Sequence, residues 1–394
     1  MKTKPWAGLS WSEWQWTRTE RGDVLSAAAG FGIAAIAFYL PGVPLTIALL
    51  GLVAAGRAPV RRRFAIVLGW HLAAVWPAML GLWNLGGPAT PLILLVLWLG
   101  ITTLIFTALG PGIGTLLSLA FPWHIGSATL AAGELWPGTR ELGLVLIPAM
   151  LCGLCSRQRA WQASTFFGVA AISACTWWAW DPFNANEYLE VDLDTPPAIT
   201  TRGQELALIE RLPNNSTVWL GENIVSLKDR AALSRWCGYA AQLQSELFVG
   251  ALERNNRSAI RRFDPNDCRA NVVYERLFGL PGVSGGSGIG AGQLEDVTIG
   301  GRSIRWLICF EAFLPAAWKD MAIQPEAVVV IVTNDRWTHP VPVDVARRKV
   351  ALSMARLWAV APVLAETGRS TVEHAQPVDH HRSYPKLSQN DKLM

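Results

Sequence analysis

The sequence predicts a two-part fold, in which an N-terminal bundle of membrane-spanning helices precedes a C-terminal α/β domain. Of the 394 residues, 51% are hydrophobic and only 16% are charged. Residues 24–180 are almost entirely apolar, whereas acidic, basic and apolar residues alternate from about residue 181 onward. In this second part, continuous apolar runs alternate with helix-like segments, which is typical of buried strands in an α/β domain.

The first 23 residues form a polar segment that is rich in tryptophan. We expect this segment either to lie on the bilayer surface or to be a disordered tail, and the sequence leaves both alternatives open. No small-residue cleavage site follows the first apolar stretch, so we do not expect a cleavable signal peptide.

Residues 24–180 are expected to form the transmembrane helical domain, with six or seven spans. A spanning helix needs ~17–20 apolar residues. The two stretches on either side of Pro41-Gly42 and the fifth stretch, 111–124, are shorter than ~20 residues. They are interpreted as a tight helical hairpin and a half-helix. The seven candidate spans are 24–40, 43–56, 64–83, 91–109, 111–124, 141–155 and 161–179.

Basic residues indicate the orientation of this bundle. They cluster before the first span, after the second and after the sixth, at Lys2, Lys4, Arg18, Arg21, Arg57, Arg61, Arg62, Arg63, Arg157 and Arg159. With seven spans these clusters share one side, which the positive-inside rule makes the cytoplasmic side. Everything after Trp180 then lies outside the cytoplasm. The net charge is only +4 and no basic stripe is present, so we expect no direct nucleic-acid binding.

Residues 181–200 are interpreted as a linker, and three buried strands follow it, each ending in reactive side chains. "STVWLGEN" stops at Glu222, "SIRWLICFE" stops at Cys309, and "AVVVIVTND" stops at Asn334 and Asp335. Ligands of α/β domains sit beyond the carboxyl ends of their strands. These ends therefore predict a site.

Cys309 and Glu222 form a plausible catalytic device only when they are considered together. A lone buried cysteine is usually an inert apolar side chain, and a lone strand-end glutamate is usually solvated. Together, a carboxylate that accepts the thiol proton would activate the sulfur as a nucleophile. Cys237 and Cys268 would form a disulfide in an oxidising compartment if they are close, which the sequence leaves open. We expect no metal site, because the "CGLC" at 152–155 has no second pair of ligands.

The motifs "WLGEN", "YERLFGLPG", "LICFEAFLP" and "VTNDRW" resemble, in this order, those of the nitrilase superfamily of carbon-nitrogen hydrolases. The membrane half narrows the likeness to the apolipoprotein N-acyltransferase branch. The compact membrane region with "AAGELWPGTRELGL" is most similar to TraB-type conjugal transfer proteins. The resemblance implies an α-β-β-α sandwich over residues 201–375, no cofactor, and a bacterial inner-membrane protein with a periplasmic domain. The chain departs from the family after this domain, where the polar residues 376–394 are expected to form an irregular tail.

The resemblance also implies roles for single residues. Cys309 matches the nucleophile of a Glu-Lys-Cys triad and Glu222 matches its general base. Arg276 occupies the place of the lysine, and the swap is not conservative because a guanidinium is a planar fork. Glu311 matches an acid that orients the site, and Asn334 and Asp335 are expected to support it.

Three functions follow from the resemblance. The first is acyl transfer or amide hydrolysis through a Cys309 thioester, in a TraB-like role in conjugation. The second is a catalytically weak membrane accessory factor, which Arg276 favours. The third is lipoprotein maturation by a true apolipoprotein N-acyltransferase. The implied partners are membrane lipids, with a phospholipid as acyl donor or a lipoprotein or pilus protein as substrate.

Overall fold

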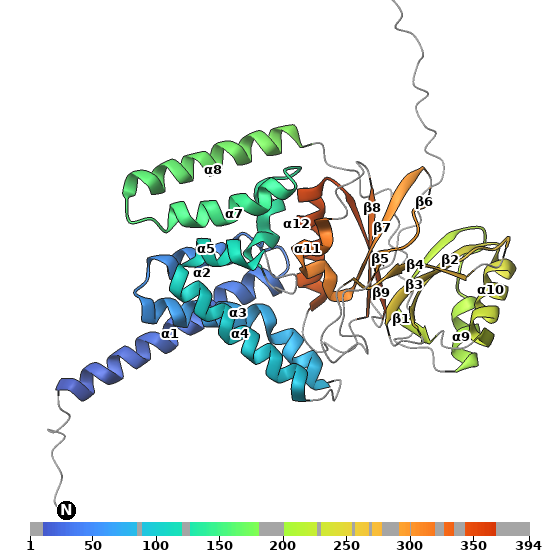
Figure 1. The fold of residues 1–394 in the computed structure, drawn as a ribbon, viewed down its shortest axis with the longest axis horizontal. Coiled ribbons are helices and arrows are strands. Elements are labelled where there is room, and N and C mark those ends of the chain that lie inside the picture. Colours follow the sequence, from blue (N-terminus) through green and yellow to red (C-terminus); the bar gives the residue numbers. More distant parts are fainter. Residues whose placement is uncertain are drawn as a thin grey trace, which may run out of the picture.

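The computed structural model describes residues 11–84, 89–119, 127–180, 201–226, 230–253, 257–267, 270–277, 291–299, 301–319, 327–334 and 343–367. The predicted linker 181–200 and the predicted tail 376–394 lie outside these residues. Within them, a helical half precedes an α/β half (Figure 1).

The described part of the helical half contains long helices and several short ones. Helix α1 includes residues 11–23 as well as the first candidate span, and α5 covers only the start of the fifth candidate span. The elements are α1 (Trp11–Tyr39), α2 (Ile47–Arg57), α3 (Val60–Asn84), α4 (Ala89–Leu109), α5 (Pro111–Ser118), the 3-10 turn η1 (Ala128–Ala131), α6 (Ala132–Leu135), α7 (Glu141–Leu154) and α8 (Arg159–Ala179).

Among the described residues, one helical segment is both long and apolar enough to cross a membrane, Arg21–Tyr39. Ile47–Arg57, Val96–Leu109 and Glu141–Leu154 are shorter apolar helices. The expected number of six or seven spans therefore stays a prediction.

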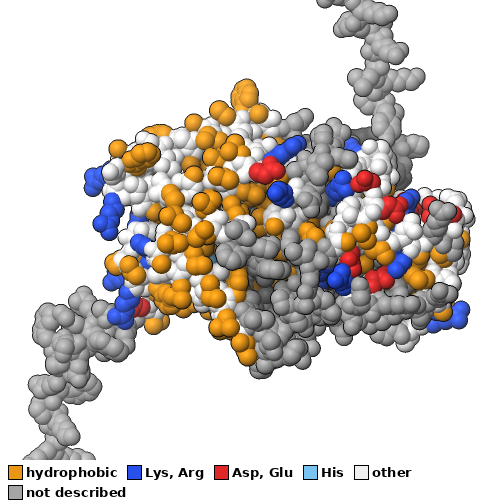
Figure 2. All heavy atoms as spheres, in the orientation of Figure 1, with side chains coloured by type: hydrophobic (Ala, Val, Ile, Leu, Met, Phe, Trp, Pro, Cys, Tyr) orange, Lys and Arg blue, Asp and Glu red, His pale blue; other side chains and the backbone are white. Residues whose placement is uncertain are grey.

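The surface of the helical half is strongly apolar. Hydrophobic side chains gather over it in Figure 2, and large ones are exposed on several helices, including Ile101, Leu104, Phe167 and Trp178, which is 92% exposed. Helix α8 has no buried residue at all. Exposed apolar patches of this extent mark contact with lipid or with another protein.

Two sheets form the centre of the α/β half. In the first, β1 and β2 are parallel and the remaining pairs are antiparallel; in the second, β6 is antiparallel to β7, and β7, β8 and β9 are parallel. The first sheet has the order β1 (Thr217–Ser226), β2 (Glu246–Leu252), β3 (Ser258–Phe263), β4 (Ala270–Glu275) and β5 (Gly292–Gln293), and the second has β6 (Val297–Ile299), β7 (Arg302–Ile308), β8 (Val328–Asn334) and β9 (Ala361–Thr367).

Helices cover the outer faces of both sheets, so the layers run helix, sheet, sheet, helix (Figure 1). The inner faces share one core, in which the rings of Phe248 and Trp306 lie 5.0 Å apart. Helices α9 (Arg202–Ile209) and α10 (Arg230–Leu243) pack on the first sheet, and α11 (Pro315–Trp318) and α12 (Val343–Trp358) pack on the second. The predicted α/β class is confirmed.

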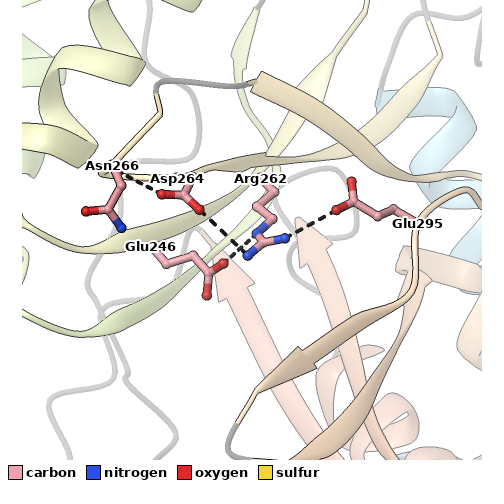
Figure 3. A network of polar contacts seen from close by, with 5 residues as sticks. All are labelled: Glu246, Arg262, Asp264, Asn266 and Glu295. Carbon is pink, nitrogen blue, oxygen red and sulfur yellow. Dashed lines mark hydrogen bonds and ion pairs between the residues drawn. The ribbon is translucent and has the colours of Figure 1, made fainter.

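An ion-pair network lies where β2 begins and β3 ends in the first sheet (Figure 3). The Arg262 guanidinium on β3 contacts Glu246 at 2.5 Å, Glu295 at 3.2 Å and Asp264 at 3.9 Å. The three carboxylates come from β2, from the residues after β5 and from the residues after β3. One cation therefore reinforces the pairing of β2 with β3 and attaches the segment after β5 to it.

Helix α12 also joins the two halves of the molecule. The backbone N–H groups of Gly138 and Arg140 donate to the carbonyls of Arg356 and Leu357, at 2.8 and 2.9 Å. The Lys349 ammonium donates to the carbonyl of Leu40 at 2.8 Å, just beyond α1. The α/β half is thus seated on the bundle through one helix that belongs to its own core.

Candidate functional site

Cys309 stands at a sharp turn at the carboxyl end of β7. Strand β7 ends at Ile308, and the 3-10 turn η3 (Cys309–Phe313) starts at Cys309 itself. The cysteine has φ of +57°, in the left-handed region that residues other than glycine rarely adopt. Such a conformation persists where the surrounding structure enforces it, and it is concentrated at functional sites. The side chain is 7% exposed.

A buried carboxylate holds this turn from within. Glu311 has no exposed surface, and its Oε2 accepts hydrogen bonds from the Ile308 N–H at 2.7 Å and from the Tyr274 hydroxyl at 3.0 Å. The carboxylate therefore fixes the residue that precedes the cysteine. This geometry fits the orienting role expected of Glu311. Tyr274 is the first residue of the motif "YERLFGLPG", but the sequence predicts no role for it.

Glu222 and Arg276 form a buried ion pair. Arg276 Nη2 donates to Glu222 Oε1, and the Ser258 hydroxyl donates to the same oxygen at 3.2 Å. Ser258 also accepts the backbone N–H of Arg276 at 3.0 Å through its carbonyl. Ser258 thus positions both charged residues, and no sequence motif points to it.

A bulge in β1 directs Glu222 into the site. The pairing of β1 with β2 is regular up to Leu220 and shifts before Val225. A Cβ atom at Gly250 on β2 would lie 2.2 Å from the Gly221 carbonyl oxygen and 2.8 Å from Glu222 Cα. Only glycine fits there, because the bulged backbone passes so close.

Charge in this site is balanced around one guanidinium. Burial disfavours the charged form of Arg276, but Glu222, Cys309 and Glu311 lie close enough to raise its pKa above the ordinary value. The guanidinium carbon is 5.8 Å from the centre of the Phe310 ring, in reach of a cation–π interaction. A permanent positive charge therefore faces both carboxylates and the sulfur.

Strand β8 completes the described part of the site. Asn334 Nδ2 at its carboxyl end donates to the backbone carbonyl of Glu222 at 3.2 Å. Five of the six predicted residues are thus linked by direct contacts or by electrostatics, whereas Asp335 lies outside the described residues. Two other cations of the α/β half, Lys228 and Lys319, are candidates for the place of the family lysine; Lys319 is exposed at the end of α11, and Lys228 is outside the described residues.

The other cysteines fall into two groups. Cys237 on α10 is disulfide-bonded, and its expected partner Cys268 lies outside the described residues. Cys152, Cys155 and Cys175 carry thiols that form no disulfide, and so does Cys309. No cluster of three or more His, Cys, Asp or Glu side chains within the described ranges is arranged to hold a metal ion.

No protein-family model matches the chain. Among curated proteins, it is similar to the "Probable conjugal transfer protein TraB" of Sinorhizobium fredii (strain NBRC 101917 / NGR234), with 26% identity over 271 residues. The match covers 60% of this chain and 65% of that protein, so the chain spans just under two thirds of the relative's length.

Among solved structures, the chain is similar to XC1258 from Xanthomonas campestris, a CN-hydrolase superfamily protein with an arsenic adduct in its active site. The identity is 18% and the TM-score 0.30, with 42% of this chain and 69% of that chain covered. The sequence match to the Sinorhizobium protein supports the resemblance that the motifs indicate, to TraB-type proteins of the nitrilase superfamily.

Proposed function

We propose that the chain is a membrane-embedded, nitrilase-like protein that performs acyl transfer or amide hydrolysis through a Cys309 thioester, in the service of plasmid conjugation. The observation that carries the proposal is the strained turn at Cys309, with the guanidinium of Arg276 held beside it by Glu222. The α-β-β-α order of layers and the TraB match point in the same direction.

The site can perform both halves of such a reaction. The Cys309 sulfur attacks an ester or amide carbonyl carbon while its proton passes to Glu222, and a C–S bond forms. The C–O or C–N bond then breaks, and the leaving group takes the proton from Glu222. An amine or a water molecule next attacks the thioester and gives a proton to Glu222; the C–S bond breaks and the proton returns to the sulfur. Arg276 supplies positive charge for the oxyanion.

A second function is favoured by the Arg276–Glu222 contact itself. A carboxylate that is engaged by a buried guanidinium must give up part of that interaction when it accepts a proton. A chain with slow or absent turnover would act in conjugation as a membrane accessory factor that binds its partners. The two candidates differ in whether the sulfur of Cys309 is needed.

We propose that the helical half lies in the bacterial inner membrane, with the α/β half on the periplasmic side. Arg57 binds the carbonyl of Leu154 at the end of α7, and Arg63 binds the carbonyl of Thr107 near the end of α4. Lys349 of the α/β half contacts the opposite end of α1 from the Asp23–Arg61 ion pair. The end of the bundle that carries Arg57, Arg61 and Arg63 is thus distant from the α/β half, as the positive-inside rule would require.

Two further observations support this location. The exposed apolar side chains of the helices would face lipid. The disulfide at Cys237 is typical of an oxidising compartment, such as the periplasm. A membrane phospholipid is then the natural acyl donor, and a lipoprotein or pilus protein the natural acceptor. Lipoprotein maturation by an apolipoprotein N-acyltransferase is one form of this reaction.

The full chain with Cys309→Ala, produced in a plasmid donor strain, tests the proposal. We expect loss of plasmid transfer, and loss of the thioester that a radiolabelled phospholipid or ester leaves on the purified protein. Cys175→Ala, which removes an exposed thiol on α8, should change neither. Retained transfer without any thioester would support the accessory role. If Cys309→Ala leaves both transfer and thioester formation intact, the enzymatic proposal is wrong.

A further inference from the structure

We propose that Tyr274 is a positioning residue that sets the reactivity of Cys309 through Glu311. The inference rests on the proposed function, since it concerns the same sulfur. Tyr274 lies on β4, in the first sheet, whereas Cys309 and Glu311 follow β7 in the second. The tyrosine therefore connects the two sheets at the site.

The contact is built as a support for the turn. The Tyr274 side chain is 3% exposed, and its hydroxyl donates to Glu311 Oε2 at 3.0 Å. The same oxygen accepts the N–H of Ile308 at 2.7 Å. Ile308 is the residue directly before Cys309, whose φ is +57°. Removal of the hydroxyl would take one donor away from this buried carboxylate oxygen, at the point where the chain enters its strained conformation.

The direction of this hydrogen bond is fixed by protonation. Burial raises the pKa of Tyr274 well above its usual value, and the Glu311 carboxylate raises it further. The phenol thus keeps its proton at any pH near neutrality and acts as the donor. It partly neutralises the carboxylate, whose negative charge would otherwise act on the nearby sulfur.

Arg276, which directly follows β4, has a positioning role comparable to that of Tyr274. It lies two residues after Tyr274, and it contacts the other carboxylate of the site, Glu222. The phenol thus serves Glu311, and the guanidinium serves Glu222. A tyrosine that only filled the core would need no hydroxyl at this position.

Tyr274→Phe tests the inference, with the rate of iodoacetamide labelling of Cys309 in the full-length protein followed against pH by peptide mass spectrometry. The uncompensated Glu311 charge should disfavour the thiolate, so the midpoint of the rate profile moves upward. An upward move of about one pH unit slows labelling at pH 7 about tenfold. An unchanged midpoint in folded protein would refute the inference.

Tyr239→Phe is the matched control. Tyr239 is also buried, and its hydroxyl also donates to a glutamate, Glu205 Oε2, at 3.4 Å, on the outer side of the first sheet. We expect its removal to leave the Cys309 midpoint unchanged. An equal shift in both variants would show that any lost tyrosine hydroxyl loosens the site, and would overturn a specific role for Tyr274.

A double-mutant cycle tests whether Tyr274 acts through Glu311. In a Glu311→Gln background the carboxylate charge is gone, so Tyr274→Phe should change the labelling rate less than about twofold, because coupled residues are not additive. A tenfold loss in that background as well would refute the route through Glu311. If Tyr274→Phe does not fold, 2,3-difluorotyrosine at position 274 is a stronger donor and should move the midpoint downward.

These outcomes are separable from failure of the proposed function. A wild-type Cys309 that labels no faster than a model thiol would count against the proposed chemistry. A fast wild-type Cys309 whose rate profile is insensitive to Tyr274→Phe would refute only the positioning role.

Discussion

Arg276 occupies the position at which the family motif has a lysine, and this is the main departure of the site from that motif. One end of the guanidinium contacts Glu222, while its Nε is buried and has no hydrogen-bond partner among the described residues. A lysine would offer one compact ammonium in place of this planar fork. The substitution therefore couples the cation to the carboxylate more rigidly than a lysine could.

Replacement of Arg276 by methionine should strongly destabilise the α/β half. It leaves the Glu222 charge buried without its main partner, and loss of one member of a buried pair costs about 3–5 kcal/mol. Thermal unfolding of the full chain in detergent measures the loss. Arg276→Met combined with Glu222→Gln removes both charges and should be less destabilised than Arg276→Met alone. A double variant that is worse than the single one would contradict this account.

At the scale of single residues, the sequence predicted the side chains at which apolar runs stop and missed residues that contact them from other strands. Cys309, Glu222 and Asn334 are visible because an apolar run stops at each of them. The predicted strand ends hold for Cys309 and Asn334, whereas the prediction that a strand stops at Glu222 is wrong, because β1 continues through a bulge to Ser226.

Ser258 starts an ordinary strand sequence, and Tyr274 starts a motif in which only Arg276 is assigned a role; the roles of both come from partners 36 and 37 positions away. The Ser258 contact depends on how β1 and β3 lie within the first sheet, and the Tyr274 contact on how the two sheets face one another, and a single sequence encodes neither locally.

At the scale of elements, the close approach of α6 to α12 explains why a glycine stands at position 133. A Cβ atom there would lie 1.7 Å from the carbonyl oxygen of Ser353. The backbone bonds from Gly138 and Arg140 to the end of α12 follow within a few residues. Together they make the segment 132–140 a seat for the C-terminal turn of α12.

Gly133→Ala should loosen this seat. Overpacking of a tight contact costs about 1–3 kcal/mol, and here the obstacle is backbone, which cannot rotate away. We expect a lower unfolding temperature in detergent and faster tryptic cleavage of the α/β half. Gly168→Ala on α8 is the control, because no atom lies within 4 Å of the place that the alanine Cβ would occupy, and alanine favours helix. Equal behaviour of the two variants would show that the seat is not tight.

Residues 125–140 show that hydropathy does not predict whether protein or lipid covers a short apolar stretch. The hydropathy pattern predicts a connection between spans over residues 125–140, yet Ala128–Ala131 and Ala132–Leu135 are helical and largely buried against α12. Burial in protein and burial in lipid select the same apolar side chains, so a short apolar stretch does not show which of the two covers it. The α/β order of strands and helices was predictable, because each strand has its own bounded apolar run.

At the scale of the whole molecule, the two ends of the bundle differ: one carries basic side chains, and the other contacts the α/β half. One end carries Arg57, Arg61 and Arg63, and the other receives α12 of the α/β half. This polarity is a property of the three-dimensional arrangement, whereas the sequence supports it only if the spans are counted correctly.

Single cysteines introduced at the two ends test the orientation. Lys319→Cys lies on the exposed surface of the α/β half, and Arg61→Cys lies at the basic end, where the native side chain is 60% exposed. A membrane-impermeant maleimide added to intact spheroplasts should label position 319, and should label position 61 only after lysis, as site-specific mass spectrometry would record. The reverse pattern would contradict the proposed periplasmic location.

Helix α12 both covers the second sheet and contacts the bundle, and this has a consequence for biosynthesis. Residues 343–358 emerge from the ribosome after the whole bundle and after every described strand except β9. Until they are translated, the seat on the bundle is vacant and the second sheet lacks the longer of the two helices that cover its outer face. A frameshift upstream of this helix would therefore leave both halves uncovered at once, and we expect the cell's membrane proteases to degrade such a product entirely, with no stable bundle left behind.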